Sequence, residues 1–111
     1  MEKIEKYRTY LEQLITEYSR YKPSYGDIET QIIFDQERDH YQLSRFGWNK
    51  DQRIRGCVLH FDIKDGKIWI QHNGTELSVA KELEALGVPK EDIVLALQPP
   101  YKRVHTGYAV G

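Results

Sequence analysis

The stretch LHFDIKDGKIWIQH, residues 59–72, decides the fold. Two runs rich in β-branched and aromatic residues flank Asp65-Gly66, and Asp-Gly between such runs is a strong signal for a β-hairpin. The sequence therefore predicts two antiparallel strands joined by a two-residue turn. With Asp65 and Gly66 as the loop, the facing pairs are Lys64–Lys67, Ile63–Ile68, Asp62–Trp69, Phe61–Ile70, His60–Gln71 and Leu59–His72.

This hairpin should have two unlike faces, because successive side chains of a strand point to opposite sides of a sheet. The pairs of Leu59, Phe61 and Ile63 form the predicted core face. The opposite face carries Trp69 against Asp62, and monomeric proteins rarely leave large apolar patches bare. We therefore expect something to cover Trp69.

An amphipathic helix should precede the sheet. Between residues 2 and 21 the apolar side chains recur at steps of three and four residues, which places them on one helical face. Pro23 and Gly26 then break this pattern. The predicted apolar stripe consists of Ile4, Tyr7, Leu11, Leu14, Ile15 and Tyr18.

Two further strands are predicted before the hairpin. Residues 28–34 alternate between apolar and polar, residues 35–39 form a polar turn, and residues 40–48 form the next strand. In that strand Tyr41 and Leu43 occupy one alternation phase, whereas Phe46 and Trp48 occupy the other. Either a bulge intervenes or both sheet faces are partly covered.

A second helix should span residues 76–86, with Thr75 as its N-cap and Gly87 as its left-handed stop. A short helical turn is predicted at residues 89–92. The apolar run Ile93–Leu97 fits a buried strand or a buried helix, and we favour the strand. Pro99-Pro100 predicts an extended C-terminal tail that packs on the surface.

The predicted fold class is thus α+β, in one domain that spans residues 1–111. Its elements are an N-terminal helix, a four-stranded antiparallel sheet of two hairpins, a second helix, a short strand or turn, and the tail. At 111 residues the chain can bury one core. No apolar run is long enough to span a membrane, and the charged start predicts no signal peptide, so we expect a cytoplasmic protein.

The composition argues against strong direct binding to nucleic acid. The formal net charge is −1, whereas proteins that bind nucleic acid unaided usually carry a large basic excess. Cys57 is the only cysteine, so an intramolecular disulfide is excluded, and its place in an apolar strand pattern predicts a buried thiol without a chemical role.

No pattern in the sequence specifies catalysis. Ser44, Ser78 and Thr106 are isolated, and familiar nucleophile and phosphate-loop signatures are absent. A metal site from His60, Asp62 and His72 is disfavoured, because the predicted register puts His72 on the other face of the hairpin. We therefore expect no cofactor, no metal and no enzymatic activity.

Three segments of the chain form a recognisable set: Asn73-Gly74-Thr75-Glu76, the run Gly87-Val88-Pro89-Lys90-Glu91-Asp92-Ile93-Val94-Leu95-Ala96, and the ending Pro99-Pro100 with Arg103 and Thr106. Together they resemble the XisI family of DNA-element excision controlling factors. The helix followed by four strands also fits, so the resemblance covers essentially the whole chain. Leu97 departs from it, standing where an aromatic residue is expected.

The resemblance implies a cyanobacterial-type accessory protein that controls excision of a DNA element, such as the fdxN element. It also implies a companion protein, XisH, which looks nuclease-like, and a recombinase that carries out the recombination. DNA would then be contacted indirectly. The family brings no catalytic residues that match particular positions of this chain.

The outer face of the sheet is the predicted partner interface, with Trp69, Trp48, His60 and Asp62 as candidate contacts. Arg53, Arg55, Lys102 and Arg103 are candidates for a charged rim or for contact with DNA. Three alternatives stay open: the C-terminal tail covers the aromatic patch, the patch forms a homodimer, or the chain binds DNA directly. A small enzyme or ligand-binding domain is a further alternative.

Overall fold

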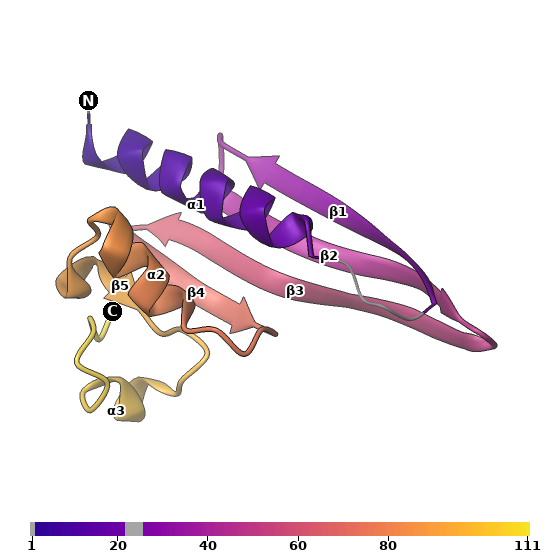
Figure 1. Ribbon diagram of the computed structural model, residues 1–111. Helices are drawn as coiled ribbons and strands as arrows, with labels where there is room; N and C mark the ends of the chain where they lie inside the picture. Colours follow the sequence, from indigo (N-terminus) through magenta and orange to yellow (C-terminus); the bar gives the residue numbers. More distant parts are fainter. Residues whose placement is uncertain (1, 22–25) are drawn as a thin grey trace.

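The computed structural model describes residues 2–21 and 26–111. One long helix, four long strands and a short C-terminal group of elements follow one another along the chain (Figure 1). The elements are α1 (Lys3–Ser19), β1 (Asp27–Asp35), β2 (His40–Asn49), β3 (Gln52–Lys64), β4 (Lys67–Asn73), α2 (Val79–Leu86), the 3-10 turn η1 (Lys90–Asp92), β5 (Ile93–Val94) and α3 (Pro100–Arg103).

The sheet has five strands in the order β1-β2-β3-β4-β5. Neighbours from β1 to β4 are antiparallel, whereas β5 runs parallel to β4 through the pairs Ile68–Ile93 and Trp69–Val94. The α+β class and the four antiparallel strands are confirmed, but the sheet is not limited to these four, because β5 joins it as a fifth, parallel strand. A fifth, parallel strand forms because α2 and η1 return the chain to the starting end of β4 before Ile93.

Both longer helices pack on one face of the sheet, here called the inner face. The predicted stripe of α1 is confirmed, since five of its six members are buried and Ile4 packs against them. Side chains from alternate positions of β2, β3 and β4 complete the core. The buried sheet residues are Tyr41, Leu43, Leu59, Phe61, Ile63, Ile68 and Ile70, and α2 adds Val79, Ala80 and Leu83.

A bulge in β3 sets which residues of this strand face the core. Ser44 pairs with Cys57 but Leu43 pairs with Leu59, so Val58 is an extra residue on β3. β2 itself alternates without interruption along β1. Neither predicted alternative holds in full for β2. The bulge lies in its partner strand β3, and β2 itself places Tyr41 and Leu43 in the core and Phe46 and Trp48 on the opposite face.

The β3–β4 hairpin follows the predicted register only near its turn. The pairs from Lys64–Lys67 to Phe61–Ile70 are confirmed. Beyond them a second bulge makes Gln71 the extra residue, so His60 lies opposite His72 and Leu59 opposite Asn73. The predicted pairs His60–Gln71 and Leu59–His72 are therefore wrong.

The second helix begins later than predicted. Asn73 Oδ1 accepts hydrogen bonds from the backbone N–H of Thr75 at 2.9 Å and from its Oγ1 at 2.6 Å. Thr75 is thereby held in an Asx-type turn and does not cap the helix. Ser78 caps it instead, and α2 starts at Val79. The predicted stop is confirmed, because Gly87 is left-handed with φ 113°.

The C-terminal segment differs from its prediction at two points. Only Ile93 and Val94 of the apolar run form a strand. Pro99 is extended, but Pro100 opens α3 because proline fits the first position of a helix. The N–H of Ala109 then donates to the Ile93 carbonyl at 2.8 Å, so the tail continues the sheet beyond β5.

The ribbon of β1, β2 and β3 extends past the C-terminal end of α1 (Figure 1). Its three strands are 9, 10 and 13 residues long. Among the helices within residues 2–21 and 26–111, none is long and apolar enough to cross a membrane.

Gly47 and Gly56 allow a matched test of how closely β1 and β2 approach. A Cβ on Gly47 would lie 2.0 Å from the Asp27 carbonyl oxygen, whereas a Cβ on Gly56 would meet no described atom within 4 Å. We expect Gly47→Ala to lower the free energy of unfolding by about 3 kcal/mol, the upper end of the usual overpacking cost. Gly56→Ala should change it by less than about 1 kcal/mol.

Urea titration measures both effects through the unfolding midpoint. Equal midpoints for the two variants would contradict the close approach of β1 to Gly47.

Candidate functional site

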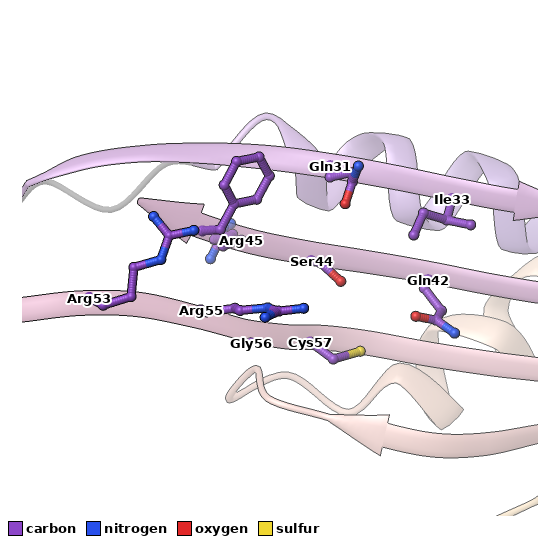
Figure 2. Close-up of a pocket in the computed structure, with 10 residues that line it drawn as sticks. Gln31, Ile33, Gln42, Ser44, Arg45, Arg53, Arg55, Gly56 and Cys57 are labelled. Carbon is purple, nitrogen blue, oxygen red and sulfur yellow. The ribbon is translucent and has the colours of Figure 1, made fainter. Parts of the chain in front are cut away.

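The face of the sheet opposite α1 and α2, here called the outer face, contains an open hollow of about 530 Å³. Figure 2 shows that its lining comes from three adjacent strands, β1, β2 and β3. The strand pairing brings them together, because Phe46 lies opposite Arg55 and Ser44 opposite Cys57. The lining residues are Gln31, Ile33, Gln42, Ser44, Arg45, Phe46, Arg53, Arg55, Gly56 and Cys57.

Large apolar side chains are exposed in and beside this hollow. Ile33 is 42% exposed and Trp48 is 52% exposed. The Arg53 guanidinium carbon lies 5.3 Å from the centre of the Trp48 ring, a cation–π contact. Asp27 and Glu29 line a smaller hollow next to Trp48. Polar and basic side chains therefore make up most of the lining, while Ile33 and Trp48 add exposed apolar area and Asp27 and Glu29 lie in the adjacent hollow.

Cys57 lies in the larger hollow and is half-buried. Its S–H donates a hydrogen bond to the Leu59 carbonyl at 3.2 Å. Burial raises the pKa of the thiol, so the nucleophilic thiolate is disfavoured at neutral pH. Cys57 is suited to lining a surface and poorly suited to nucleophilic catalysis.

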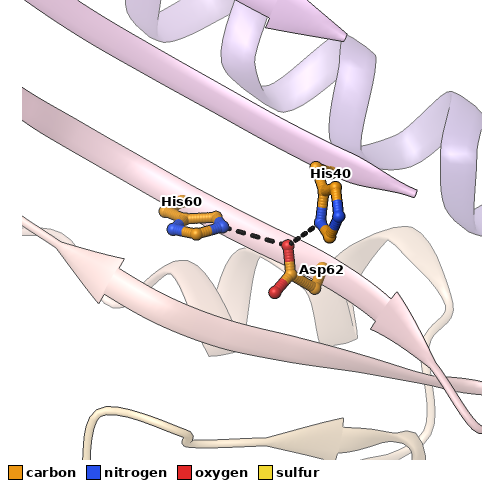
Figure 3. A group of neighbouring side chains, drawn as sticks. All are labelled: His40, His60 and Asp62. Atoms are coloured by element: carbon orange, nitrogen blue, oxygen red, sulfur yellow. Dashed lines mark hydrogen bonds and ion pairs between the residues drawn. The ribbon is translucent and has the colours of Figure 1, made fainter. Parts of the chain in front are cut away.

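Three side chains meet at a second place on the outer face, as Figure 3 shows: His40 of β2, and His60 and Asp62 of β3. Their possible ligand atoms lie within 4.8 Å of one another. The set considered from the sequence contained His72 in place of His40. The predicted register put His72 on the other face of the hairpin. This is wrong, because the β4 bulge places His72 opposite His60. Its ring is nevertheless not part of this group.

Trp69 is half-buried under the chain's own C-terminal segment. Its Nε1 donates to the Lys64 carbonyl at 3.0 Å, and the Lys64 ammonium lies 4.8 Å from the ring centre. The Arg103 guanidinium carbon lies 5.6 Å from the ring. Arg103 is itself fixed, since it donates to the carbonyls of Gln98 and Ala96. Of the open alternatives, cover by the tail is the one observed at Trp69.

The predicted contacts therefore share one face but form two groups. Trp48, Arg53 and Arg55 lie at the β2–β3 end, whereas His60 and Asp62 lie with Trp69 near the β3–β4 turn. Nine strand positions separate Arg53 from Asp62, which corresponds to about 30 Å. Lys102 lies outside both groups, over the ring of Tyr101.

Comparisons with known proteins agree with this architecture. The family described as XisI protein matches residues 1–110 of the chain. The chain belongs to the XisI family. The resemblance inferred from its sequence motifs is thereby confirmed. A search of curated proteins found no match.

Two solved structures from Anabaena variabilis ATCC 29413 are similar to this XisI-family chain. A XisI-like protein shares 49% identity with it at a TM-score of 0.91. The fdxN element excision controlling factor XisI shares 31% identity at a TM-score of 0.84. Each comparison covers 99% of this chain and 100% of the solved chain.

The XisI motifs have structural roles in this chain. Asp92 accepts a hydrogen bond from the Tyr7 hydroxyl and pairs with the Lys3 ammonium at 3.2 Å, which ties η1 to α1. Burial and the Asp92 carboxylate both raise the pKa of Tyr7. Thr106 Oγ1 donates to the Arg103 carbonyl at 2.8 Å. The residues that identify the family therefore fix the fold and lie outside the outer-face hollow.

The two tryptophans allow the cover on Trp69 to be tested. Trp69→Ala removes the stacking surface of Arg103 and Lys64, so we expect faster amide hydrogen exchange in residues 98–111. Trp48→Ala is the matched control and should leave exchange there unchanged, because Trp48 lies at the far end of the sheet. Mass spectrometry measures amide exchange in both variants. Equal protection of residues 98–111 in the two variants would contradict the contact of Trp69 with Arg103.

Proposed function

We propose that this XisI-family chain is a non-enzymatic accessory protein that controls excision of a DNA element by binding a XisH-like partner. The similarity to the fdxN element excision controlling factor supports a role in the control of DNA-element excision. The hollow on the outer face supports the mode of action, because the exposed apolar side chains of Ile33 in its lining and of Trp48 beside it form the kind of patch that marks interaction sites on monomers. The partner, and through it a recombinase system, would contact the DNA.

The composition of the outer face fits a protein partner better than a nucleic acid. Ile33 supplies exposed apolar area in the hollow, and Trp48 supplies it in the smaller hollow beside it. Arg53 and Arg55 could approach phosphates, but Asp27 and Glu29 lie beside Arg53 and the whole chain has a net charge of −1. Aromatic residues and arginine are enriched in protein interfaces, so Trp48 beside Arg53 and Arg55 suits a protein partner.

The absence of enzymatic activity is part of the proposal. The hollow offers Ser44 and Cys57 as hydroxyl and thiol groups. The pKa of the Cys57 thiol is raised, which disfavours the thiolate that would act as a nucleophile. Asp92 and Arg103, which belong to the family motifs, make contacts that stabilise the fold. Binding a partner requires no reactive side chain.

Co-purification with a XisH-like protein tests the interface. In the complex Trp48 would be buried, and truncation of a buried interface aromatic typically costs at least 2 kcal/mol, about 30-fold in affinity. We expect Trp48→Ala to weaken the complex by about that factor in a titration. Tyr101→Ala is the matched control, because Tyr101 is 72% exposed on α3, outside the hollow.

The proposal fails if no complex forms between the purified proteins at low or moderate salt. The interface assignment alone fails if Tyr101→Ala weakens the complex as much as Trp48→Ala. A chain that instead binds DNA directly would show affinity that falls steeply with salt and with neutralisation of Arg53 and Arg55. A homodimer would appear as a doubled mass of the isolated chain in light scattering.

The single cysteine gives an independent readout of the same surface. Cys57 lines the hollow, so a bound partner should slow its alkylation by iodoacetamide several-fold. Intact-mass spectrometry of this chain follows the reaction, because the chain carries one thiol. Unchanged alkylation in a complex that demonstrably forms would place the partner elsewhere.

A further inference from the structure

One carboxylate oxygen on the outer face is shared by two histidines. Asp62 Oδ1 lies 2.8 Å from His40 Nδ1 and 3.0 Å from His60 Nε2, and it accepts a hydrogen bond from each ring (Figure 3). The other carboxylate oxygen, Oδ2, accepts from Gln71 Nε2 at 3.2 Å. Three side chains, from β2, β3 and β4, thus converge on the carboxyl group of Asp62.

The strands hold these groups in place. His40 begins β2 and pairs directly with Asp62, whereas His60 stands two positions along the same strand on the same face. Gln71 is the extra residue of the β4 bulge, and bulges re-aim side chains. Sites built on strands are more precise than sites built on loops. The convergence is therefore set by backbone pairing.

We propose that His40, His60 and Asp62 bind a divalent transition-metal ion, with Zn²⁺ as the reference ion. Two imidazole nitrogens and one carboxylate are a recurrent set of protein ligands for zinc and for non-haem iron. Calcium and magnesium prefer sites made of oxygen atoms, so the two nitrogens disfavour them. This site is separate from the partner-binding hollow and does not depend on the proposed function.

The spacing of the ligand atoms fits this proposal. In a tetrahedral site with bonds of 2.0–2.1 Å, neighbouring ligand atoms lie about 3.3 Å apart. Each histidine nitrogen lies within about half an ångström of that separation from Asp62 Oδ1. The ligand atoms as a group lie within 4.8 Å of one another, so small side-chain rotations would bring them around one ion. A metal ion would replace the two hydrogen-bonded protons, because a ligating ring nitrogen must be deprotonated.

Exposure of the group gives the ion an entry path and a free coordination position. The side chain of His40 is 49% exposed and that of His60 is 29% exposed, while Asp62 is 18% exposed. The ion would reach the ligands from solvent, and a water molecule would complete its coordination. Gln71 would hold the carboxylate from behind, which is the usual role of residues that contact a metal ligand.

Titration of the metal-free chain with Zn²⁺ by calorimetry is the first test. We expect one ion per chain, and a loss of affinity of at least about 10-fold for His40→Ala or Asp62→Asn. Gln71→Ala should lower the Zn²⁺ affinity about 10-fold, because the Asp62 carboxylate would lose its hydrogen bond from Gln71. His105→Ala is the matched control, because His105 is an exposed histidine of the C-terminal segment, and it should bind like the parent.

A fluorescence experiment leaves all the ligands intact and so avoids any folding defect. Trp69 pairs directly with Asp62, whereas eight strand positions, about 26 Å, separate Trp48 from His40. In the Trp48→Phe variant, Co²⁺ should quench the remaining Trp69 emission with a saturable, one-site curve. In the Trp69→Phe variant, the emission of Trp48 should change little.

Two results would overturn the proposal. One is equal Zn²⁺ affinity of the parent, His40→Ala and His105→Ala, which would place the ion elsewhere on the chain. The other is equal quenching of the two tryptophans, which would indicate collisional or scattered binding. Because both measurements use the isolated chain, a failed partner assay would leave them unaffected.

Discussion

The extra residue Val58 in β3 is the constraint on which the rest of the structure depends. On the β2–β3 turn side of Val58, Arg53, Arg55 and Cys57 point to the outer face. Beyond it the alternation is reset, so Leu59 and Phe61 enter the core with no exposed area. Without the bulge those two side chains would lie on the outer face, because a shift of one residue reverses a strand's faces.

The energies show why the interruption persists. A bulge disturbs the ladder locally and leaves one residue unpaired, whereas burial of a Leu or Phe side chain contributes about 1.5–3 kcal/mol each. The structure also uses the freed backbone, since the Val58 carbonyl accepts a hydrogen bond from the N–H of Gly74 at 2.7 Å. Core burial therefore outweighs the loss in the ladder, and the loop before α2 is fixed by the same residue.

The bulge also creates both candidate sites on the outer face. It separates the hollow around Cys57 from the group around Asp62, and it sets His40 opposite Asp62. Counting from the β2–β3 turn without the bulge would place His40 opposite Phe61, a core residue. Fold and sites thus have one origin, because the register that buries Leu59 and Phe61 also places His60 and Asp62, which alternate with them, on the outer face.

The sequence by itself determined α1, the four antiparallel strands, the end of α2 and the family. Periodicity identified α1, Asp65-Gly66 identified the β3–β4 turn, and Gly87 identified the end of α2, because each signal acts within a few residues. The XisI resemblance rested on local motifs of the same kind, which explains why it held over residues 1–110.

Only the tertiary structure decided the two bulges, the parallel fifth strand, the tail over Trp69 and the meeting of His40 with His60 and Asp62. Each depends on contacts between distant segments. A bulge has no composition of its own, and its position follows from which register buries the most apolar surface. Ile33 was likewise unforeseen at the hollow, because its place beside Gln42 depends on the pairing of β1 with β2.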